Sequence, residues 1–186
     1  MPTDRTATGV SGTDPSGTDP SGTDASAATG TVAQARGSQV ALARALATCA
    51  HDGQTDKAGA AYIHHPEAVA AAFDPQAHWV EHCAAWLHDV LEDTALTVTD
   101  LRSAGVAEEV VNVVVLLTRT SDVPDDEYYR RIRGDARARR VKLADIAHNT
   151  DPQRRAQLPQ QTRDRLDAKY TKALAALGAV GDSQCP

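Results

Sequence analysis

Helical periodicity restricts the fold of this chain more than any other feature of its sequence. From about residue 38 to residue 177, apolar side chains recur three and four positions apart, and the alternation typical of strands is scarce. We therefore expect an all-α fold. The predicted helices cover residues 38–51, 66–73, 76–92, 99–104, 107–119, 125–133, 135–149 and 160–177. The valine-rich segment 110–117 would also suit a buried strand, but a lone strand would have no partner, so we prefer helix there.

The N-terminal part of the chain differs in composition from the rest. Residues 11–25 repeat the unit Ser-Gly-Thr-Asp-Pro twice and then read Ser-Gly-Thr-Asp-Ala, with no apolar side chain able to seed a core. We predict a disordered tail over residues 1–36, a single folded domain over residues 37–180, and a flexible end over residues 181–186. The middle segment is long enough to bury a full core.

A cluster of acidic residues with one histidine lies in the segment 86–93, within the third predicted helix. No lysine or arginine occurs between Lys57 and Arg102, so these carboxylates repel one another unless a cation neutralises them. A bound metal ion is the simplest such cation. The polar residues of the segment are His88, Asp89, Glu92 and Asp93. An ordinary amphipathic helix with its polar face in water is the alternative explanation.

One adjacent His-Asp pair cannot complete a coordination shell, so further ligands must come from other helices. His51 ends an apolar helix, and Asp145 lies in a mainly apolar segment where a carboxylate is costly to bury without a partner. We therefore expect a mixed nitrogen and oxygen site made by His51, His88, Asp89 and Asp145. A site with nitrogen and oxygen donors suits Mn²⁺, Fe²⁺ or another divalent metal ion better than a zinc site with soft ligands does. Mn²⁺ is our first choice, with Fe²⁺, Mg²⁺ and Zn²⁺ as alternatives.

Four blocks of sequence occur in an order and spacing typical of one enzyme family. They are AHDGQ at residues 50–54, YIHHP at 62–66, LHDVLEDT at 87–94, and VKLAD at 141–145 followed by HN at 148–149. With these blocks, residues 37–177 resemble the HD-domain metal-dependent phosphohydrolases. The resemblance is closer to the hydrolase domain of the RelA/SpoT-type alarmone enzymes and their small single-domain relatives.

The resemblance implies an HD-domain helical bundle and a hydrolase that removes pyrophosphate from the 3′ position of a guanosine polyphosphate. It assigns the ligands of one divalent ion to His51, His88, Asp89 and Asp145, the acid/base pair to Glu92 and Asp93, and substrate or ligand-supporting contacts to Lys57, Lys142 and Asn149. The expected partner is thus a small nucleotide. The alternatives are an HD phosphatase or phosphodiesterase acting on another nucleotide, and an alarmone sensor that binds without hydrolysing.

The chain departs from the pattern of this family at three places. Asp56 stands where the loop of the family usually has an arginine, in Asp-Lys-Ala-Gly instead of Arg-Lys-Ser-Gly. Ile146 replaces the arginine after the last aspartate, and Asp151-Pro152 replaces an Arg-Thr pair. Because an anion at Asp56 takes the place of a cation that would seek phosphate, we expect these changes to bear on which nucleotide is bound.

Other histidines invite competing interpretations. His78-Trp-Val-Glu-His82 matches the inverted zinc-protease pattern, but His82 would lie ~10 Å along a helix from the His-Asp pair. We interpret His78 and His82 as exposed or pocket-rim residues. His65 precedes Pro66, so we interpret it as packing at a helix start or supporting the ligands, and His64 as a surface residue.

Charge and cysteine usage limit the partners and the compartment. Residues 37–118 carry three Lys/Arg against eleven Asp/Glu, and residues 119–172 carry fourteen against nine. This asymmetry suits a metal site that faces an anionic substrate. The net charge of -6 and the lack of interleaved aromatic residues argue against nucleic acid. The three cysteines lack paired spacing and no run of ~20 apolar residues exists, so we expect a cytoplasmic protein without a membrane span. No pattern indicates an oligomeric state.

Overall fold

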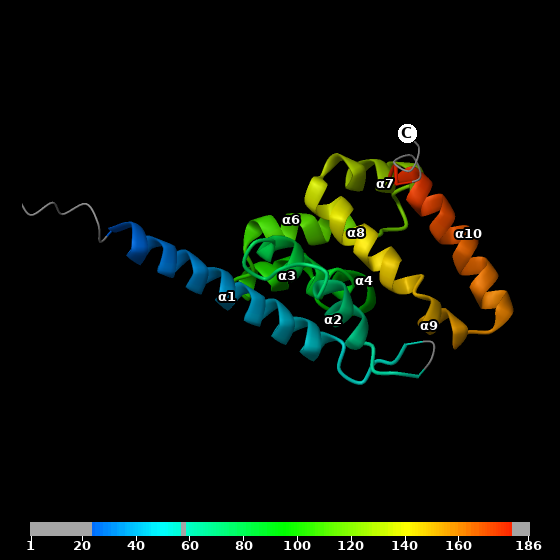
Figure 1. Ribbon diagram of the computed structural model, residues 1–186, viewed down its shortest axis with the longest axis horizontal. Coiled ribbons are helices and arrows are strands. Elements are labelled where there is room, and N and C mark those ends of the chain that lie inside the picture. The colour runs from blue at the N-terminus through cyan, green and yellow to red at the C-terminus, as the bar shows by residue number, and fades with distance from the viewer. Residues whose placement is uncertain (1–23, 57–58, 180–186) are drawn as a thin grey trace, which may run out of the picture.

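A computed structural model describes residues 24–56 and 59–179 of the chain, and side chains of the first helix from residue 30 onward. Within these ranges the only β-type pairing is an isolated bridge between Thr55 and Ala61, so the predicted all-α class is confirmed. The helices are α1 (Asp24–Ala50), α2 (His64–Ala70), α3 (Trp79–Leu87), α4 (Val90–Asp93), α5 (Val98–Ser103), α6 (Glu108–Leu117), α7 (Asp125–Gly134), α8 (Ala136–Asn149), α9 (Pro152–Ala156) and α10 (Gln160–Ala176) (Figure 1).

Helix α3 lies at the centre of the bundle and contacts α1, α2, α6 and α8. Its apolar side chains, including Val80, Cys83 and Leu87, are buried, and each fully buried aliphatic side chain stabilises the fold by about 1.5–3 kcal/mol. Helix α8 crosses the middle of the molecule, and α10 runs along one side (Figure 1). The central position of α3 carries its C-terminal end, with the His-Asp pair, into the interior.

The valine-rich segment is helical, as predicted. Helix α6 buries Val110, Val111 and Val114, and it packs against α3, α5, α7 and α8. Four helical neighbours supply the apolar contacts that a lone strand would have lacked. The preference for helix over strand at residues 110–117 is therefore confirmed, and its cause is packing and not the intrinsic propensity of valine.

The single helix predicted over residues 76–92 is wrong. Residues 76–78 form a turn in which the Asp74 carboxylate accepts hydrogen bonds from the backbone N–H groups of Gln76 and Ala77. Helix α3 then ends at Leu87, and α4 begins at Val90. Between them His88 places its Nδ1 2.7 Å from the carbonyl oxygen of Ala85. This side-chain contact competes with the helical ladder, and His88 and Asp89 stand between the two helices.

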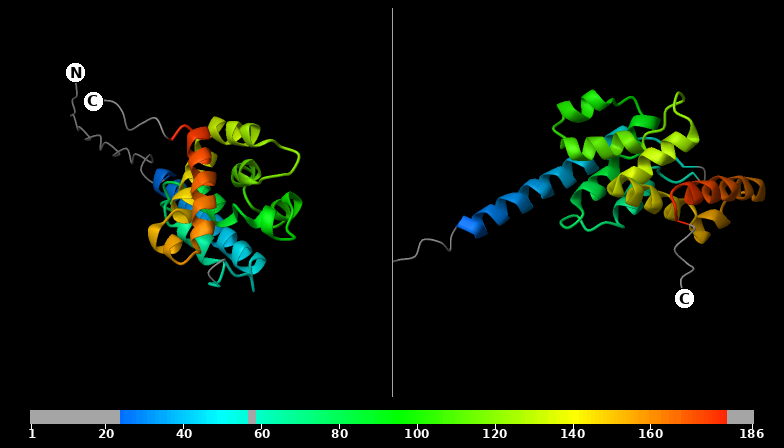
Figure 2. Two further views of the ribbon diagram at one scale, coloured as in Figure 1. Left: turned by 90° about the vertical axis from the view of Figure 1, so that its right-hand side faces the viewer. Right: turned by 90° about the horizontal axis from the view of Figure 1, so that it is seen from above.

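Helix α1 begins earlier than the sequence predicts. Residues 24–36, predicted as part of the disordered tail, form its first turns. The segment is rich in alanine, and extending an existing helix is much easier than nucleating one. Arg36 donates to the carbonyl oxygen of Gln76. The first part of α1 projects beyond the bundle (Figures 1 and 2). The predictions for residues 1–23 and 181–186 lie outside the described residues.

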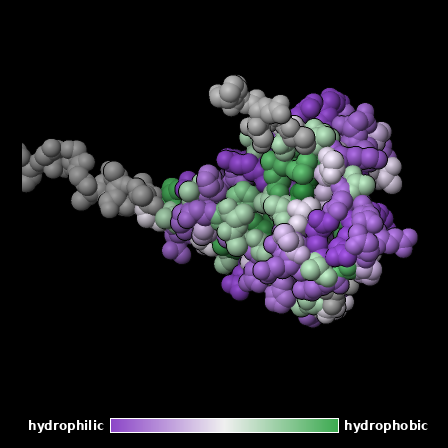
Figure 3. All heavy atoms as spheres, turned by 45° about the vertical axis from the view of Figure 1, so that its right-hand side comes forward, coloured by the Kyte–Doolittle hydropathy of each residue, from purple (hydrophilic) through white to green (hydrophobic). Residues whose placement is uncertain are grey.

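The surface of the described region is largely hydrophilic. On the face shown in Figure 3, hydrophilic residues cover most of the described surface and separate smaller apolar areas. Among the residues whose side chains are described, Val32 and Val115 are the large apolar residues that stand exposed. None of the described helices combines the length and the apolar character that crossing a membrane requires.

Candidate metal centre

Three buried side chains from three helices meet at the centre of the bundle. His65 comes from α2, His88 follows the end of α3, and Asp145 comes from α8, and one ligand atom of each lies within 4.8 Å of the others. His65 Nε2 is 3.2 Å from His88 Nε2 and 3.2 Å from Asp145 Oδ1. His88 Nε2 is 3.8 Å from the same oxygen. Three potential metal ligands thus converge on one point.

Asp89 adds a second carboxylate to this group. Its Oδ2 lies 3.1 Å from His88 Nε2 and 3.5 Å from His65 Nε2. His88 and Asp89 are the two residues between α3 and α4, and their side chains reach the same point. We call His65, His88, Asp89 and Asp145 the metal cluster. The structure therefore brings together three of the four ligands predicted from the sequence.

The electrostatics of the metal cluster favour a positive charge. Burial opposes ionisation of Asp89 and Asp145, but the imidazole of His88 beside the first and the ammonium of Lys142 beside the second hold both pKa values well below their usual range. Burial likewise opposes a charge on His88, yet the carboxylate of Asp89 raises its pKa to about 9. In the absence of a metal, a proton supplies this charge. Two imidazole nitrogens with two carboxylate oxygens are a donor set that fits a divalent first-row metal ion.

The carboxylate of Asp145 is held by side chains of its own helix. Lys142 Nζ donates to Asp145 Oδ2 at 2.9 Å, and Asn149 Nδ2 donates to Asp145 Oδ1 at 2.6 Å. Burial alone would lower the pKa of Lys142, but the neighbouring carboxylate raises it, so the lysine stays charged. Outer hydrogen bonds of this kind fix the direction of a metal ligand. Lys142 and Asn149, predicted as substrate or supporting contacts, both donate to the carboxylate of Asp145.

His51, a predicted ligand, and His65, predicted as a helix-start or supporting residue, lie in different surroundings. His51 follows α1 and is buried, but its ligand atoms are not among those of the three-residue group. Its Nδ1 lies 2.8 Å from Gln54 Oε1, and its Nε2 is buried without a hydrogen-bond partner among the described residues. The ring packs against Tyr62, with centroids 4.9 Å apart. His65 thus joins the metal cluster, and the ligand role of His51 stays a prediction.

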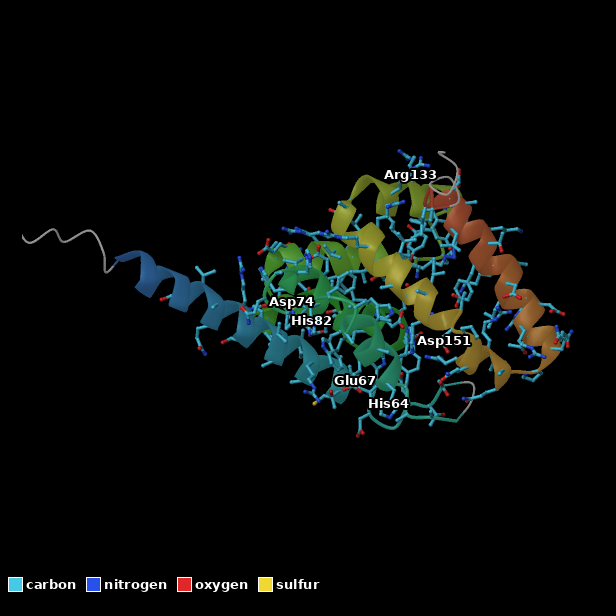
Figure 4. The ribbon with its side chains drawn as sticks, in the orientation of Figure 1. His64, Glu67, Asp74, His82, Arg133 and Asp151 are labelled. Atoms are coloured by element: carbon cyan, nitrogen blue, oxygen red, sulfur yellow. The ribbon has the colours of Figure 1, made fainter. Side chains whose placement is uncertain are left out.

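The local structure at the start of α2 explains why His65 points inward. His65 and Pro66 are both buried there, and His65 Nδ1 lies 2.7 Å from His148 Nδ1 on α8. His64 is exposed and contacts Glu67 of the same helix, and Figure 4 shows both in the N-terminal part of α2. The YIHHP block points to His65 as a candidate site residue. A histidine before proline more often packs at the start of a helix, so the sequence favours a packing or ligand-supporting role for His65 over a ligand role.

The predicted acid/base residues lie on α4, directly after the metal cluster. Glu92 Oε1 accepts a hydrogen bond from the backbone N–H of Arg119 at 2.5 Å, and partial burial of the carboxylate raises the pKa of Glu92. Tyr62 donates to Asp89 Oδ2 at 2.5 Å and also lies 3.3 Å from Asp93 Oδ2. One phenol therefore links a carboxylate of the metal cluster to a predicted acid/base residue.

A small pocket opens beside Glu92, between α4, α7, α8 and α10. It is lined by Glu92, Arg119, Tyr128, Tyr129, Lys142, Ile146, Lys169, Tyr170 and Ala173. Its cations and aromatic rings are of the kind that bind phosphates and bases. Lys57, another predicted substrate contact, lies outside the described residues.

The inverted zinc-protease pattern does not form a metal site in the described part of the chain. Glu81 is buried and forms an ion pair with Arg140 of α8. His82 Nδ1 lies 2.9 Å from the carbonyl oxygen of Phe73, and its Nε2 accepts from Trp86 Nε1 at 3.2 Å. Both nitrogens of His82 are therefore engaged in holding the fold. In Figure 4, His82 and Asp74 lie near each other, and both lie away from Asp151, which follows the C-terminal end of α8.

The fold and the metal cluster define an all-α domain with a buried His-Asp centre, and comparisons with known proteins find alarmone enzymes that are similar to part of the chain. No family model matches the chain. A guanosine-3′,5′-bis(diphosphate) 3′-pyrophosphohydrolase of Haemophilus influenzae is 39% identical over 117 residues, which are 56% of this chain and 17% of that protein. The bifunctional (p)ppGpp synthase/hydrolase SpoT of Escherichia coli is 35% identical over 115 residues, or 56% and 16%. The chain thus spans about a sixth of the length of these curated relatives.

A solved structure agrees with the domain over more of its length. It is a metazoan ortholog of SpoT described as hydrolysing ppGpp, and it matches with a TM-score of 0.57 at 22% identity, covering 75% of this chain and 85% of the other. At this level of identity the likeness shows the fold. The all-α helical bundle expected from the sequence is therefore confirmed.

Proposed function

We propose that this protein is a metal-dependent phosphohydrolase acting on a nucleotide polyphosphate, with guanosine 3′,5′-bis(diphosphate) as its first candidate substrate. The observation that carries the proposal is the buried group of His65, His88 and Asp145, with Asp89 beside it. Acid/base carboxylates follow directly on α4, and a pocket with cations and aromatic rings adjoins them. The relatives, which match about half of the chain, are named as guanosine-3′,5′-bis(diphosphate) 3′-pyrophosphohydrolases, and this supports the choice of substrate.

We propose that the metal cluster holds one divalent ion, with Mn²⁺ first and Fe²⁺, Mg²⁺ and Zn²⁺ as alternatives. When bound, such an ion lowers the pKa of water and offsets negative charge on phosphoryl oxygens. Lys142 and Asn149 keep the carboxylate of Asp145 in one direction through their hydrogen bonds to its two oxygens. His65 Nε2 faces the same point as His88 Nε2, so His65 is the ligand that the proposal adds to the sequence hypothesis.

Glu92 and Asp93 move protons in the proposed reaction. A water oxygen forms a bond to the phosphorus attached at the 3′ position, and the bond from that phosphorus to the ribose 3′ oxygen breaks. The carboxylate pair takes a proton from the water and returns one to the ribose oxygen, which leaves guanosine diphosphate and pyrophosphate. The raised pKa of Glu92 brings it closer to neutral pH, where a proton acceptor is most effective.

The experiment that tests the proposal is a substrate panel. Purified protein with Mn²⁺ is incubated with guanosine and adenosine polyphosphates, and release of pyrophosphate and phosphate is measured. We expect pyrophosphate release from guanosine 3′,5′-bis(diphosphate), and its loss in Glu92→Gln. Unchanged turnover in that variant would remove Glu92 from the acid/base role.

The same panel separates the two alternative functions. Phosphate release from a different nucleotide would indicate an HD phosphatase or phosphodiesterase. Binding of guanosine polyphosphates without turnover of any compound would indicate a sensor. The contact predicted for Lys57 and the cytoplasmic location stay predictions.

A further inference from the structure

Two departures from the family pattern, far apart in the sequence, meet in space. Asp56 replaces an arginine in the loop after α1, and Asp151-Pro152 replaces an Arg-Thr pair after α8. In the structure, Arg154 of α9 donates from Nη2 to Asp56 Oδ2 at 3.1 Å. Asp151 and Pro152 begin α9 and so determine where Arg154 stands. Figure 1 shows the loop after α1 approaching α9. Arg154, from a distant part of the chain, therefore places a guanidinium beside the position where Asp56 replaces an arginine.

Arg154 also connects to the metal cluster through two stacked imidazoles. Its Nη1 lies 2.9 Å from His148 Nδ1 and 3.2 Å from His148 Nε2. The ring of His148 stacks on that of His65, with centroids 5.0 Å apart and an interplanar angle of 26°. His65 in turn presents Nε2 to His88 and Asp145. Arg154 is thus a fixed cation at the rim of the cluster, one histidine behind a proposed ligand.

The segment that carries Asp56 runs along the metal cluster from α4 to α9. Near its start, Gln54 Nε2 donates to the carbonyl oxygen of Asp93 at 2.9 Å. At its end, Tyr62 contacts Asp89 and Asp93. Asp56 lies between these contacts in the sequence and pairs with Arg154 of α9. A nucleotide at the metal cluster would therefore lie beside the loop that holds Arg154.

We propose that Arg154 is a substrate-binding residue that contacts a phosphate group of the nucleotide, and that Asp56 positions it. The inference rests on the proposed function, because it takes the same nucleotide as ligand. A guanidinium has five N–H donors, and its contacts with Asp56 and His148 use two nitrogens while leaving further donors for phosphoryl oxygens. The side chain of Arg154 is 31% exposed, so a ligand can reach it. Arginine binds phosphate with charge-assisted, often bidentate hydrogen bonds.

A purely structural latch between the loop and α9 is the alternative role for this ion pair. Partly exposed ion pairs contribute little to stability, with a median of about 0–1 kcal/mol. A latch and a positioned substrate contact differ in one respect. A latch depends equally on both partners, whereas a substrate contact depends on Arg154 more than on Asp56.

The test compares Arg154→Gln with Asp56→Asn in the full chain, each combined with Glu92→Gln to prevent turnover. Dissociation constants for guanosine 3′,5′-bis(diphosphate) and for pyrophosphate are measured by calorimetry with Mn²⁺ present. We expect Arg154→Gln to weaken nucleotide binding at least about tenfold, as the loss of a hydrogen bond to a charged group predicts, and Asp56→Asn to weaken it only about two- to fourfold. Arg154→Lys should recover part of the affinity.

Arg130→Gln on α7 is the matched control, because Arg130 is exposed and pairs with Glu127. It should leave both dissociation constants unchanged, and melting temperatures should show that all variants are folded. Equal losses in Arg154→Gln and Asp56→Asn, or no loss in Arg154→Gln, would overturn the inference. If the protein binds pyrophosphate through Arg154 but no guanosine polyphosphate, the proposed function fails while the role of Arg154 as a phosphate contact stands.

Discussion

The metal cluster and the rim at Asp56 and Arg154 are neighbours, but they are built from different kinds of contact. The cluster takes its side chains from α2, α8 and the break after α3. Three of its four residues, His65, His88 and Asp145, are 5% exposed or less, and the side chain of the fourth, Asp89, is 18% exposed. The rim is made by a loop and the short helix α9, and its ion pair is partly exposed, at 17% for Asp56 and 31% for Arg154. One region belongs to the packed interior and the other to the surface.

This difference explains where the chain can change. A residue of the metal cluster is fixed by several packed helices, and removing one partner leaves a buried charge unpaired, which is costly. At the rim, the loop after α1 can carry the aspartate and α9 the arginine of an ion pair, because solvent and long side chains tolerate such a change. His88, Asp89 and Asp145 therefore stand in the blocks that resemble the HD-domain hydrolases, whereas the departures Asp56 and Asp151-Pro152 lie at the rim.

The largest effect is expected from removing a ligand of the metal cluster. His65→Ala should weaken binding of Mn²⁺ at least about 100-fold, since even outer-shell changes cost 10–100-fold. His51→Ala should leave metal content close to that of the wild type, because the structure keeps His51 out of the group of close ligand atoms. Metal analysis of the two purified variants measures this. Loss of metal in His51→Ala with retention in His65→Ala would restore the ligand set predicted from the sequence.

A large loss of stability is expected at the support of the metal cluster. Lys142→Met removes the ammonium that pairs with the buried carboxylate of Asp145, and the free energy of unfolding should fall by roughly 3 kcal/mol. Urea unfolding of the metal-free protein measures this. Lys172→Met is the control, since Lys172 is an exposed lysine of α10. A loss no greater than that of the control would mean that Lys142 does not stabilise Asp145.

A smaller effect is expected at the rim. Asp151 accepts hydrogen bonds from the backbone N–H groups of Gln153 and Arg154 at the start of α9, so Asp151→Ala should cost about 1 kcal/mol and weaken nucleotide binding while metal content stays unchanged. Asp135→Ala removes the corresponding cap of α8 and is the matched control. It should destabilise the protein by a similar amount without weakening nucleotide binding through Arg154. Equal effects of both variants on nucleotide affinity would argue that α9 has no special role in recognition.

The smallest effect concerns a thiol in the core beside the metal cluster. Burial raises the pKa of Cys83 to about 12, so the folded protein holds this proton more tightly than the unfolded chain does. The resulting stabilisation is complete below the ordinary thiol pKa and is lost as the pH rises toward 12. At pH 8 a thiol reagent should modify the exposed Cys49 and spare Cys83, as peptide mass spectrometry would show. Rapid labelling of Cys83 would indicate that α3 opens readily.

The sequence predicts the helices well because their signal is local. Apolar spacing located the helices from α5 to α8 and α10 to within a few residues. It missed α9, whose five residues depend on the cap made by Asp151. It also missed the break after Leu87, because the contact between His88 and the carbonyl oxygen of Ala85 leaves no mark in the apolar pattern.

The metal cluster could be predicted only in part, since it depends on contacts between distant segments. His88, Asp89 and Asp145 were identified from an acidic segment without cations and from a carboxylate in an apolar helix. Spacing cannot show that His65 approaches His88 and Asp145, because this depends on how α2 packs against α3 and α8. The pairing of Asp56 with Arg154 spans 98 residues, and no local pattern indicates it.

The order of the ligands along the chain has a consequence for synthesis on the ribosome. His65 and His88 are made early, but Asp145 is made 57 residues after His88, as the difference between their numbers shows, and Arg154 follows it. Domains fold while their chains emerge, so α2 and α3 can pack against α1 before either residue exists. A nascent chain would therefore hold His65, His88 and Asp89 without the carboxylate of Asp145 until α8 has left the exit tunnel.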